Sequence, residues 1–244
     1  MDEPKNFKGQ MMPGYTPIET GQTIMIFQTP PEMVEHMNAH ADDLINQGKL
    51  EQMNLDGMGK IGKKYSLYCD DDEYAGAENH NFIPDDIHEW IKDRIHQYLQ
   101  LKNVKYYGIK THASWINEYR PGEYNPQHIH LGRYGMFNDP YHTRRHREGL
   151  VGMMALKMPE MVNVPNKEEK NEDLAKINKT GFLEFNTGNN YSMQFAHNII
   201  PILLRTGDFV VFPYDMYHCV YPHFNKTEVR RTFPVNIDVF DAEV

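Results

Sequence analysis

The segment EYRPGEYNPQHIHLG, residues 118–132, holds two histidines one residue apart behind a Pro-Gly turn and an Asn-Pro pair. In an extended chain, side chains alternate between two faces, so His128 and His130 would point the same way and Ile129 the opposite way. Two imidazoles on one face can bind the same metal ion. Such pairs are also common in surface loops, so this segment alone leaves a metal site and an ordinary loop equally open.

The sequence around this segment favours a β-rich fold. From residue 104 onward, short runs rich in Val, Ile, Tyr and Phe alternate with Gly, Pro and Asn, as is typical of strands and turns. The expected strands are residues 111–119, 126–131, 151–157, 181–186, 192–199, 208–213, 217–221 and 230–239. Pro234 in the last of them lacks a backbone donor and predicts an edge strand or a bulge. Helices followed by many short strands predict an α+β fold, mainly β, built around a double-stranded β-helix or cupin-like jelly roll.

The first part of the chain predicts two supporting helices. Apolar residues recur at helical spacing in 30–48 and again in 84–101, where Asp85 and Asp86 favour the start of a helix. Four histidines on these helices stand beside charged residues, which predicts solvated surface positions: His36, His40, His88 and His96.

Length and patterning predict a single domain over residues 1–244, because a chain of this size can bury one sizeable core. Residues 1–103 would give helical support and residues 104–244 would form the β-core. Two insertions interrupt the core strands. The first, 132–148, is rich in arginine, and the second, 158–180, mixes charges of both signs with little apolar content and predicts an exposed loop.

Composition narrows the classes of function. The net charge of −9 makes nucleic acid an unfavourable partner, because tight binding to it comes from Lys and Arg that neutralise phosphates. Cys69 and Cys219 stand in no CxxC spacing and predict neither a disulfide framework nor a zinc-thiolate site. The N-terminus lacks the apolar core of a signal peptide, and no apolar run reaches the roughly 20 residues of a membrane helix. We therefore expect a cytoplasmic protein without a membrane partner.

The last third of the chain supplies further candidate ligands. His218 begins an apolar strand within GDFVVFPYDMYHCVYP, residues 207–222. Further along, Arg230 and Thr232 would lie on one face of a strand, because alternation places Arg231 on the other face. An Arg fork beside a hydroxyl suits a carboxylate, which Arg can hold with two parallel charge-assisted hydrogen bonds. The sequence thus offers three imidazoles for a metal and a carboxylate clamp.

These motifs resemble those of a known superfamily. The run YRPGEYNPQHIH resembles the first metal-ligand motif of the prolyl-4-hydroxylase-like iron(II)/2-oxoglutarate-dependent dioxygenases. The longer pattern SWINEY…NPQHIH…LVGMMALKMP…GFLEF…GDFVVFPYDMYHCVYP…RRTFPVN is similar throughout to a group of 2-oxoglutarate/iron(II) oxygenases frequent in marine bacteria and their phages. The likeness covers residues 111–239, whereas residues 1–110 carry no motif.

The resemblance implies a hydroxylase-like oxidoreductase that uses iron(II), 2-oxoglutarate and O₂ and releases succinate and CO₂. It implies metal ligands, and hence catalytic residues, at His128, His130 and His218. Arg230 and Thr232 would hold the tail of 2-oxoglutarate. Asn117 and Tyr119 lie on the strand before the first ligand and would position cofactor and ligands, whereas we expect Trp115 to belong to the core. The primary substrate stays open, with a protein side chain or a small molecule favoured.

Departures from the superfamily pattern leave two alternatives. His130 stands where most members have Asp or Glu, so the usual two-histidine, one-carboxylate set becomes three imidazoles. Tyr214 stands where Ser is usual. The spacings from Gly122 to His130 and from Gly207 to His218 also match a three-histidine cupin dioxygenase that uses no 2-oxoglutarate, although the Glu of that pattern is absent and the carboxylate clamp would have no role. A non-catalytic jelly-roll binding protein is the other alternative.

Overall fold

The computed structural model describes residues 15–19, 22–50, 52, 60–69, 80–130, 149–160, 180–187 and 199–241. The expected insertion at 132–148 and most of the one at 158–180 lie outside these residues. In the described part of the chain, neither helix has the length and apolar character needed to cross a membrane.

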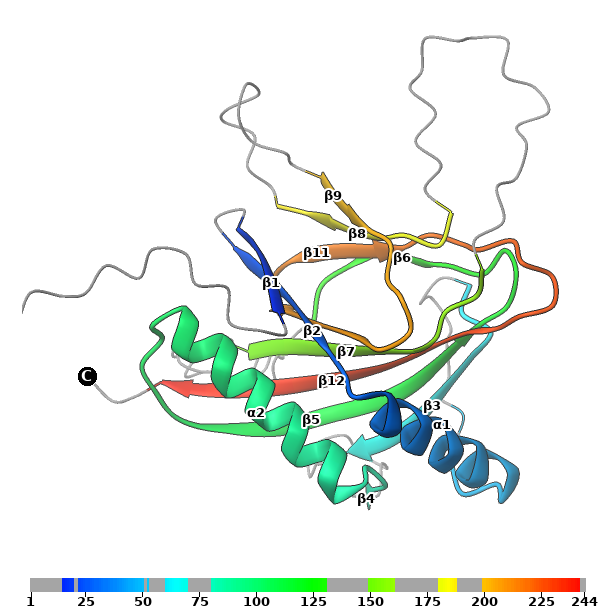
Figure 1. The fold of residues 1–244 in the computed structure, drawn as a ribbon, viewed down its shortest axis with the longest axis horizontal. Coiled ribbons are helices and arrows are strands. Elements are labelled where there is room, and N and C mark those ends of the chain that lie inside the picture. Colours follow the sequence, from blue (N-terminus) through cyan, green and yellow to red (C-terminus); the bar gives the residue numbers. More distant parts are fainter. Residues whose placement is uncertain are drawn as a thin grey trace, which may run out of the picture.

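The described residues form two antiparallel sheets and two helices (Figure 1). In chain order the elements are β1 (Tyr15–Glu19), β2 (Thr23–Gln28), α1 (Pro31–Asn46), β3 (Lys63–Cys69), β4 (His80–Asn81), α2 (Asp85–Leu101), β5 (Tyr106–Tyr119), β6 (Asn125–His128), β7 (Gly149–Lys157), β8 (Leu183–Asn186), β9 (Ile199–Ile202), β10 (Asp208–Pro213), β11 (Tyr217–Val220) and β12 (Arg230–Asp241). The larger sheet has the order β1-β2-β10-β7-β12-β5-β3-β4 and the smaller sheet the order β6-β11-β8-β9. The small sheet lies over one face of the large sheet, which is the expected jelly-roll arrangement.

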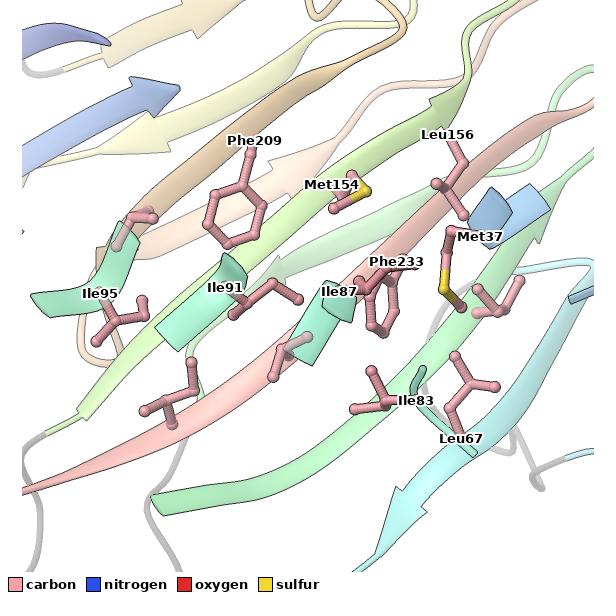
Figure 2. Packing of buried hydrophobic residues seen from close by; sticks show 14 of the residues in the cluster. Met37, Leu67, Ile83, Ile87, Ile91, Ile95, Met154, Leu156, Phe209 and Phe233 are labelled. Carbon is pink, nitrogen blue, oxygen red and sulfur yellow. The ribbon is translucent and has the colours of Figure 1, made fainter. Parts of the chain in front are cut away.

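The two helices cover the other face of the large sheet (Figures 1 and 2). Ile87, Ile91 and Ile95 of α2 are fully buried, as the helical spacing predicts. They belong to one cluster with Phe209 of β10 and Phe233 of β12. Burying each of these side chains contributes about 1.5–3 kcal/mol, which holds the helix layer on the sheet.

A second apolar cluster fills the space between the sheets. It includes Tyr119 of β5, Phe185 of β8 and Phe212 of β10. Strand alternation assigns side chains of the large sheet to one cluster or the other. On β12, Phe233 and Val235 join the helix-covered cluster. The even-numbered residues of β12 therefore face the small sheet, and this intersheet face carries the candidate site.

The strands of the core agree with the sequence prediction within a few residues, apart from one region. β9 begins at Ile199, where the strand expected at 192–199 would end, and residues 191–198 lie outside the described part. The prediction of helical support in 1–103 was incomplete. This part also contributes β1 and β2, which extend the large sheet beside β10, and β3 and β4, which extend it beside β5.

The solvated positions predicted for the four helix histidines were wrong for three of them. Three of the helix histidines are half-buried and hydrogen-bonded rather than solvated: His40 Nε2 with Phe82 O at 2.7 Å, His88 Nε2 with Thr111 Oγ1 at 2.6 Å, and His96 Nδ1 with the Tyr106 hydroxyl at 2.5 Å. They anchor the helices through polar contacts. His36 is exposed, as expected.

Pro234 lies in a central strand instead of an edge strand, because β12 runs between β7 and β5. The ladder to β7 continues through Pro234 opposite Met153, while the ladder to β5 passes from Thr232 directly to Val235. The expected bulge exists between Arg231 and Thr232 on the β7 side. A gap in one ladder therefore accommodates the missing donor.

Candidate metal centre and carboxylate clamp

Three histidines from two chain segments meet between the sheets. His128 ends β6, His130 follows it by two residues, and His218 lies on β11 directly opposite His128. Their ligand nitrogens all lie within 4.8 Å of one another. The ring centroids of His128 and His218 are 4.2 Å apart, and those of His130 and His218 are 5.1 Å apart. The structure thus brings together the three histidines that the sequence singled out, in a group that could hold a metal ion.

Backbone hydrogen bonds orient two of these rings. His128 Nδ1 donates to Pro126 O at 2.7 Å, and His218 Nδ1 donates to Met216 O at 2.9 Å. With Nδ1 protonated, Nε2 keeps its lone pair, which can accept a hydrogen bond or bind a cation. The Nε2 atoms of His130 and His218 lie 3.3 Å apart. Nitrogens this close are well placed to share one ion.

The environment keeps all three imidazoles neutral at neutral pH. Burial, and then repulsion from the positive charge that a protonated His128 would carry, lower the pKa of His218 to about 3. Burial and the two other imidazoles hold the pKa of His130 well below its usual value. The pKa of His128 is also lowered, mainly by burial. A metal binds the deprotonated ring, so the three imidazoles are already in the form that a metal ion requires.

Aromatic rings hold His130 in place. Its ring stacks on Trp115 at 5.8 Å and 11° and on Tyr214 at 6.4 Å and 23°. Its backbone N–H donates to Tyr214 O at 2.9 Å, and the Tyr214 hydroxyl donates to Asp238 Oδ1 at 3.1 Å. A Cβ at Gly149 would overlap the Tyr214 ring, so glycine there makes room for it. Trp115, expected in the core, is buried against a candidate ligand instead.

Arg230 is a buried cation on the same intersheet face. It is 1% exposed, its Nη1 donates to Gly181 O at 2.9 Å, and its guanidinium lies 5.9 Å from the centre of the Tyr119 ring. Within the described residues, its Nε and Nη2 have no hydrogen-bond partner, and neither do Thr232 Oγ1 and Asn117 Oδ1. Thr232 and Asn117 lie opposite each other on β12 and β5. These groups lie on the intersheet face, where the two unpartnered guanidinium donors could bind an acceptor.

The next residue on the strand, Arg231, has the opposite environment. It points to the helix side, where its Nη2 donates to Glu118 Oε1 at 2.6 Å and to Asp42 Oδ1 at 2.6 Å. Burial acts to lower the pKa of Arg231, but the two carboxylates outweigh burial, and the pKa is raised above its usual value. In contrast, burial lowers the pKa of Arg230 to about 10, and only the Tyr119 hydroxyl acts against it. Arg231 therefore serves the structure, whereas Arg230 is available to a ligand.

Asn125 links Tyr119 of β5 to the candidate ligand His128. Its amide nitrogen lies 3.3 Å from His128 Nε2, and its side chain also hydrogen-bonds the buried Tyr119 hydroxyl. Burial raises the pKa of Tyr119 to about 12, so this hydroxyl stays protonated. The sequence predicted roles for Tyr119 and Arg230, whereas it gave no role to Lys64, which lies opposite Asn117 on β3. The stretch KKYSLYC, residues 63–69, carries little signal for a strand, because two lysines begin it.

Comparisons with known proteins agree with this fold. No family model and no curated protein matches the sequence. An oxidoreductase of the 2OG-Fe(II) oxygenase family from Burkholderia pseudomallei has a TM-score of 0.53 at 9% identity, over 88% of this chain and 83% of that chain. The non-heme α-ketoglutarate-dependent carbocyclase SnoK from nogalamycin biosynthesis gives 0.53 at 12% identity, over 89% and 80%. AviO1 from Streptomyces viridochromogenes Tue57 gives 0.51 at 14% identity, over 91% of each chain. The chain thus has the double-stranded β-helix fold found in 2OG-Fe(II) oxygenases, as its motifs predicted.

Proposed function

We propose that this chain is an iron(II)- and 2-oxoglutarate-dependent oxygenase that hydroxylates a primary substrate. The observation that carries the proposal is the pairing of two features on one buried face. Three neutral imidazoles converge there, and Arg230 lies nearby with two donors that no described group accepts from. A metal alone would explain only the first feature.

The residues fit the cosubstrate for a reason of charge. A buried cation without a partner costs several kcal/mol, and a carboxylate held by a guanidinium fork offsets that cost. 2-Oxoglutarate has a keto-acid end that can chelate iron and a distal carboxylate that can reach a cation. Arg230 and Thr232 would hold the distal carboxylate, and Asn117 would lie beside it.

Each residue then has a defined task. His128, His130 and His218 would hold iron(II), while the bonds to Pro126 O and Met216 O keep two of the rings in the required tautomer. Stacking on Trp115 and Tyr214 would hold the third ring against rotation. Bound iron(II) with 2-oxoglutarate and O₂ supplies the oxidising power for hydroxylation, with succinate and CO₂ as products.

The three-histidine set distinguishes this site from the usual one. Replacing a carboxylate ligand by a neutral imidazole leaves one more positive charge on the metal complex. A cupin-type dioxygenase that uses no 2-oxoglutarate accommodates such a set, and it is the second candidate. The unneutralised Arg230 favours the 2-oxoglutarate enzyme, because the cupin chemistry leaves that cation without a role.

Succinate formation tests the proposal. Protein loaded with iron(II) and supplied with 2-oxoglutarate and O₂ should release succinate, tested alone and with a panel of peptides and small metabolites as primary substrates. His218→Ala should bind no iron and form no succinate, whereas His36→Ala, which alters an exposed histidine of α1, should behave as wild type. Iron bound stoichiometrically by His218→Ala would overturn the ligand assignment. Iron-loaded wild type that never forms succinate would favour the cupin alternative.

A further inference from the structure

Lys64 is a buried lysine on the face that carries the candidate site. It lies on β3 and is 9% exposed. Its neighbours Tyr65 and Leu67 belong to the helix-covered cluster, so alternation turns Lys64 toward the small sheet. Lys64 lies opposite Asn117 of β5, which in turn lies opposite Thr232 of β12. The three residues form one row across three strands.

The amine of Lys64 lies beside the candidate metal ligands. Its Nζ is 4.1 Å from the centre of the Trp115 ring, and that ring stacks on His130. Its positive charge also contributes to the lowered pKa values of His128 and His130. Lys64 therefore contacts Trp115, the residue on which the candidate ligand His130 stacks.

The charge of Lys64 is unbalanced in the described residues. Burial alone lowers its pKa to about 8, and no described carboxylate acts against this effect. Stacking over an aromatic ring offsets only part of the cost of burying the cation. Asn117 Oδ1, next to it in the row, also lacks a partner within the described part. Arg231 shows the opposite case, because two carboxylates accompany that buried cation.

We propose that Lys64 binds a carboxylate of the primary substrate, so that the enzyme acts on an organic acid. The inference rests on the proposed function for the identity of the pocket. Lys64 and Thr232 are two strands apart, or roughly 10 Å at the usual strand spacing, so the substrate carboxylate is separate from the one assigned to Arg230. One unit of buried positive charge is matched by one carboxylate, whereas a phosphate dianion would leave excess negative charge.

Acetate and its neutral analogue acetamide provide matched probes. Their binding is measured by saturation-transfer NMR on the zinc(II)-loaded protein saturated with 2-oxoglutarate, which occupies Arg230. The variants are Lys64→Met, which keeps the length of the side chain, and Lys64→Arg, which keeps the charge. Lys63→Met is the control, because Lys63 precedes Lys64 on the same strand and alternation turns it to the other face.

We expect acetate but not acetamide to bind wild type, with Lys64→Met weakening acetate by roughly tenfold or more through loss of a charged hydrogen bond. Lys64→Arg and Lys63→Met should retain binding. Equal acetate binding by Lys64→Met, absence of acetate binding to wild type, or a preference for inorganic phosphate would overturn the inference. So would weaker 2-oxoglutarate binding by Lys64→Met. Failure of iron-loaded wild type to bind 2-oxoglutarate would count against the proposed function instead. The comparison of acetate binding between wild type and Lys64→Met would still test the role of Lys64.

Discussion

Arg230 and Arg231 are adjacent in sequence but differ in what surrounds their charges. Arg231 is neutralised by Asp42 and Glu118, while Arg230 is 1% exposed and has one backbone carbonyl as its hydrogen-bond partner among the described residues. A protein can retain a buried cation of the second kind when a ligand completes it. The proposed 2-oxoglutarate site depends on Arg230 more than on any other residue.

Arg230→Gln should weaken 2-oxoglutarate by roughly tenfold to a hundredfold, the effect expected for losing hydrogen bonds to a charged group. Isothermal titration calorimetry of the zinc(II)-loaded protein measures the Kd, and zinc stoichiometry should stay unchanged. Arg231→Gln is the matched control and should lower stability while leaving the Kd near that of wild type. If the two variants exchanged these effects, the strand register assumed for the clamp would be wrong.

At the level of single residues, most of the site could be predicted from the sequence. His128, His130, His218 and the choice of Arg230 over Arg231 follow from motif spacing and strand alternation, which are local properties. The role of Trp115 could not be predicted, because an aromatic residue on a buried strand face fits a core and a pocket equally well. Its place beside His130 depends on how the two sheets lie against each other.

Among the elements, helices were easier to predict than strands. The periodicity of α2 identified its buried residues, because one face of the helix contacts the sheet and the other contacts solvent. β2 was missed because both of its faces are largely covered, so TIMIFQ shows no alternation. β3 was missed because Lys63 and Lys64 begin it, and a buried lysine breaks the expected pattern of strand residues.

Gly149 of β7 packs against the ring of Tyr214, on which the candidate ligand His130 stacks. Gly149→Ala should displace the Tyr214 ring and lower the free energy of unfolding by about 1–3 kcal/mol, as overpacking does. Urea unfolding measures this change, and metal affinity should fall because His130 loses one of the two rings, Trp115 and Tyr214, on which it stacks. Gly108→Ala in β5 is the control, because a Cβ there contacts no other atom within 4 Å. Equal stability of the two variants would show that Tyr214 is not confined as described.

On the scale of the whole molecule, the ion pairs of Arg231 connect the helix layer to the sheet. Asp42 lies on α1, and Arg231 lies on β12. Partial burial acts to raise the pKa of Asp42, but the hydrogen bond and the charge of Arg231 outweigh it and lower the pKa below 3.8. A carboxyl whose pKa is lowered on folding stabilises the protein above its unfolded pKa and loses this contribution as pH falls through the folded value.

Asp42→Asn should therefore lower the free energy of unfolding at pH 7 by about 0.2–1 kcal/mol, because Asp42 is half exposed and solvent screens the pair. The difference from wild type should shrink below pH 3.8 and disappear under the folded pKa. Chemical denaturation at a series of pH values measures it. A difference that stayed constant through the acid range would mean that the pair contributes nothing through its charge.

The two faces of the large sheet have different roles. Helices, the outer sheet face and Arg231 stabilise the fold, while the intersheet face collects three histidines, Arg230 and Lys64. The motifs predicted this double-stranded β-helix, since strand order and spacing carry the information. They could not predict that Lys64 lies opposite Asn117, because this pairing depends on β3 joining the sheet beside β5.

An anaerobic titration of the iron(II)-loaded protein with 2-oxoglutarate tests directly whether the cosubstrate binds to iron at the three-histidine site. Chelation of iron by the keto acid produces a visible metal-to-ligand charge-transfer band. We predict that the band appears and saturates at one 2-oxoglutarate per iron, with three histidine ligands in place. Iron bound at full stoichiometry without such a band would contradict the account, and Arg230 would then serve a different carboxylate.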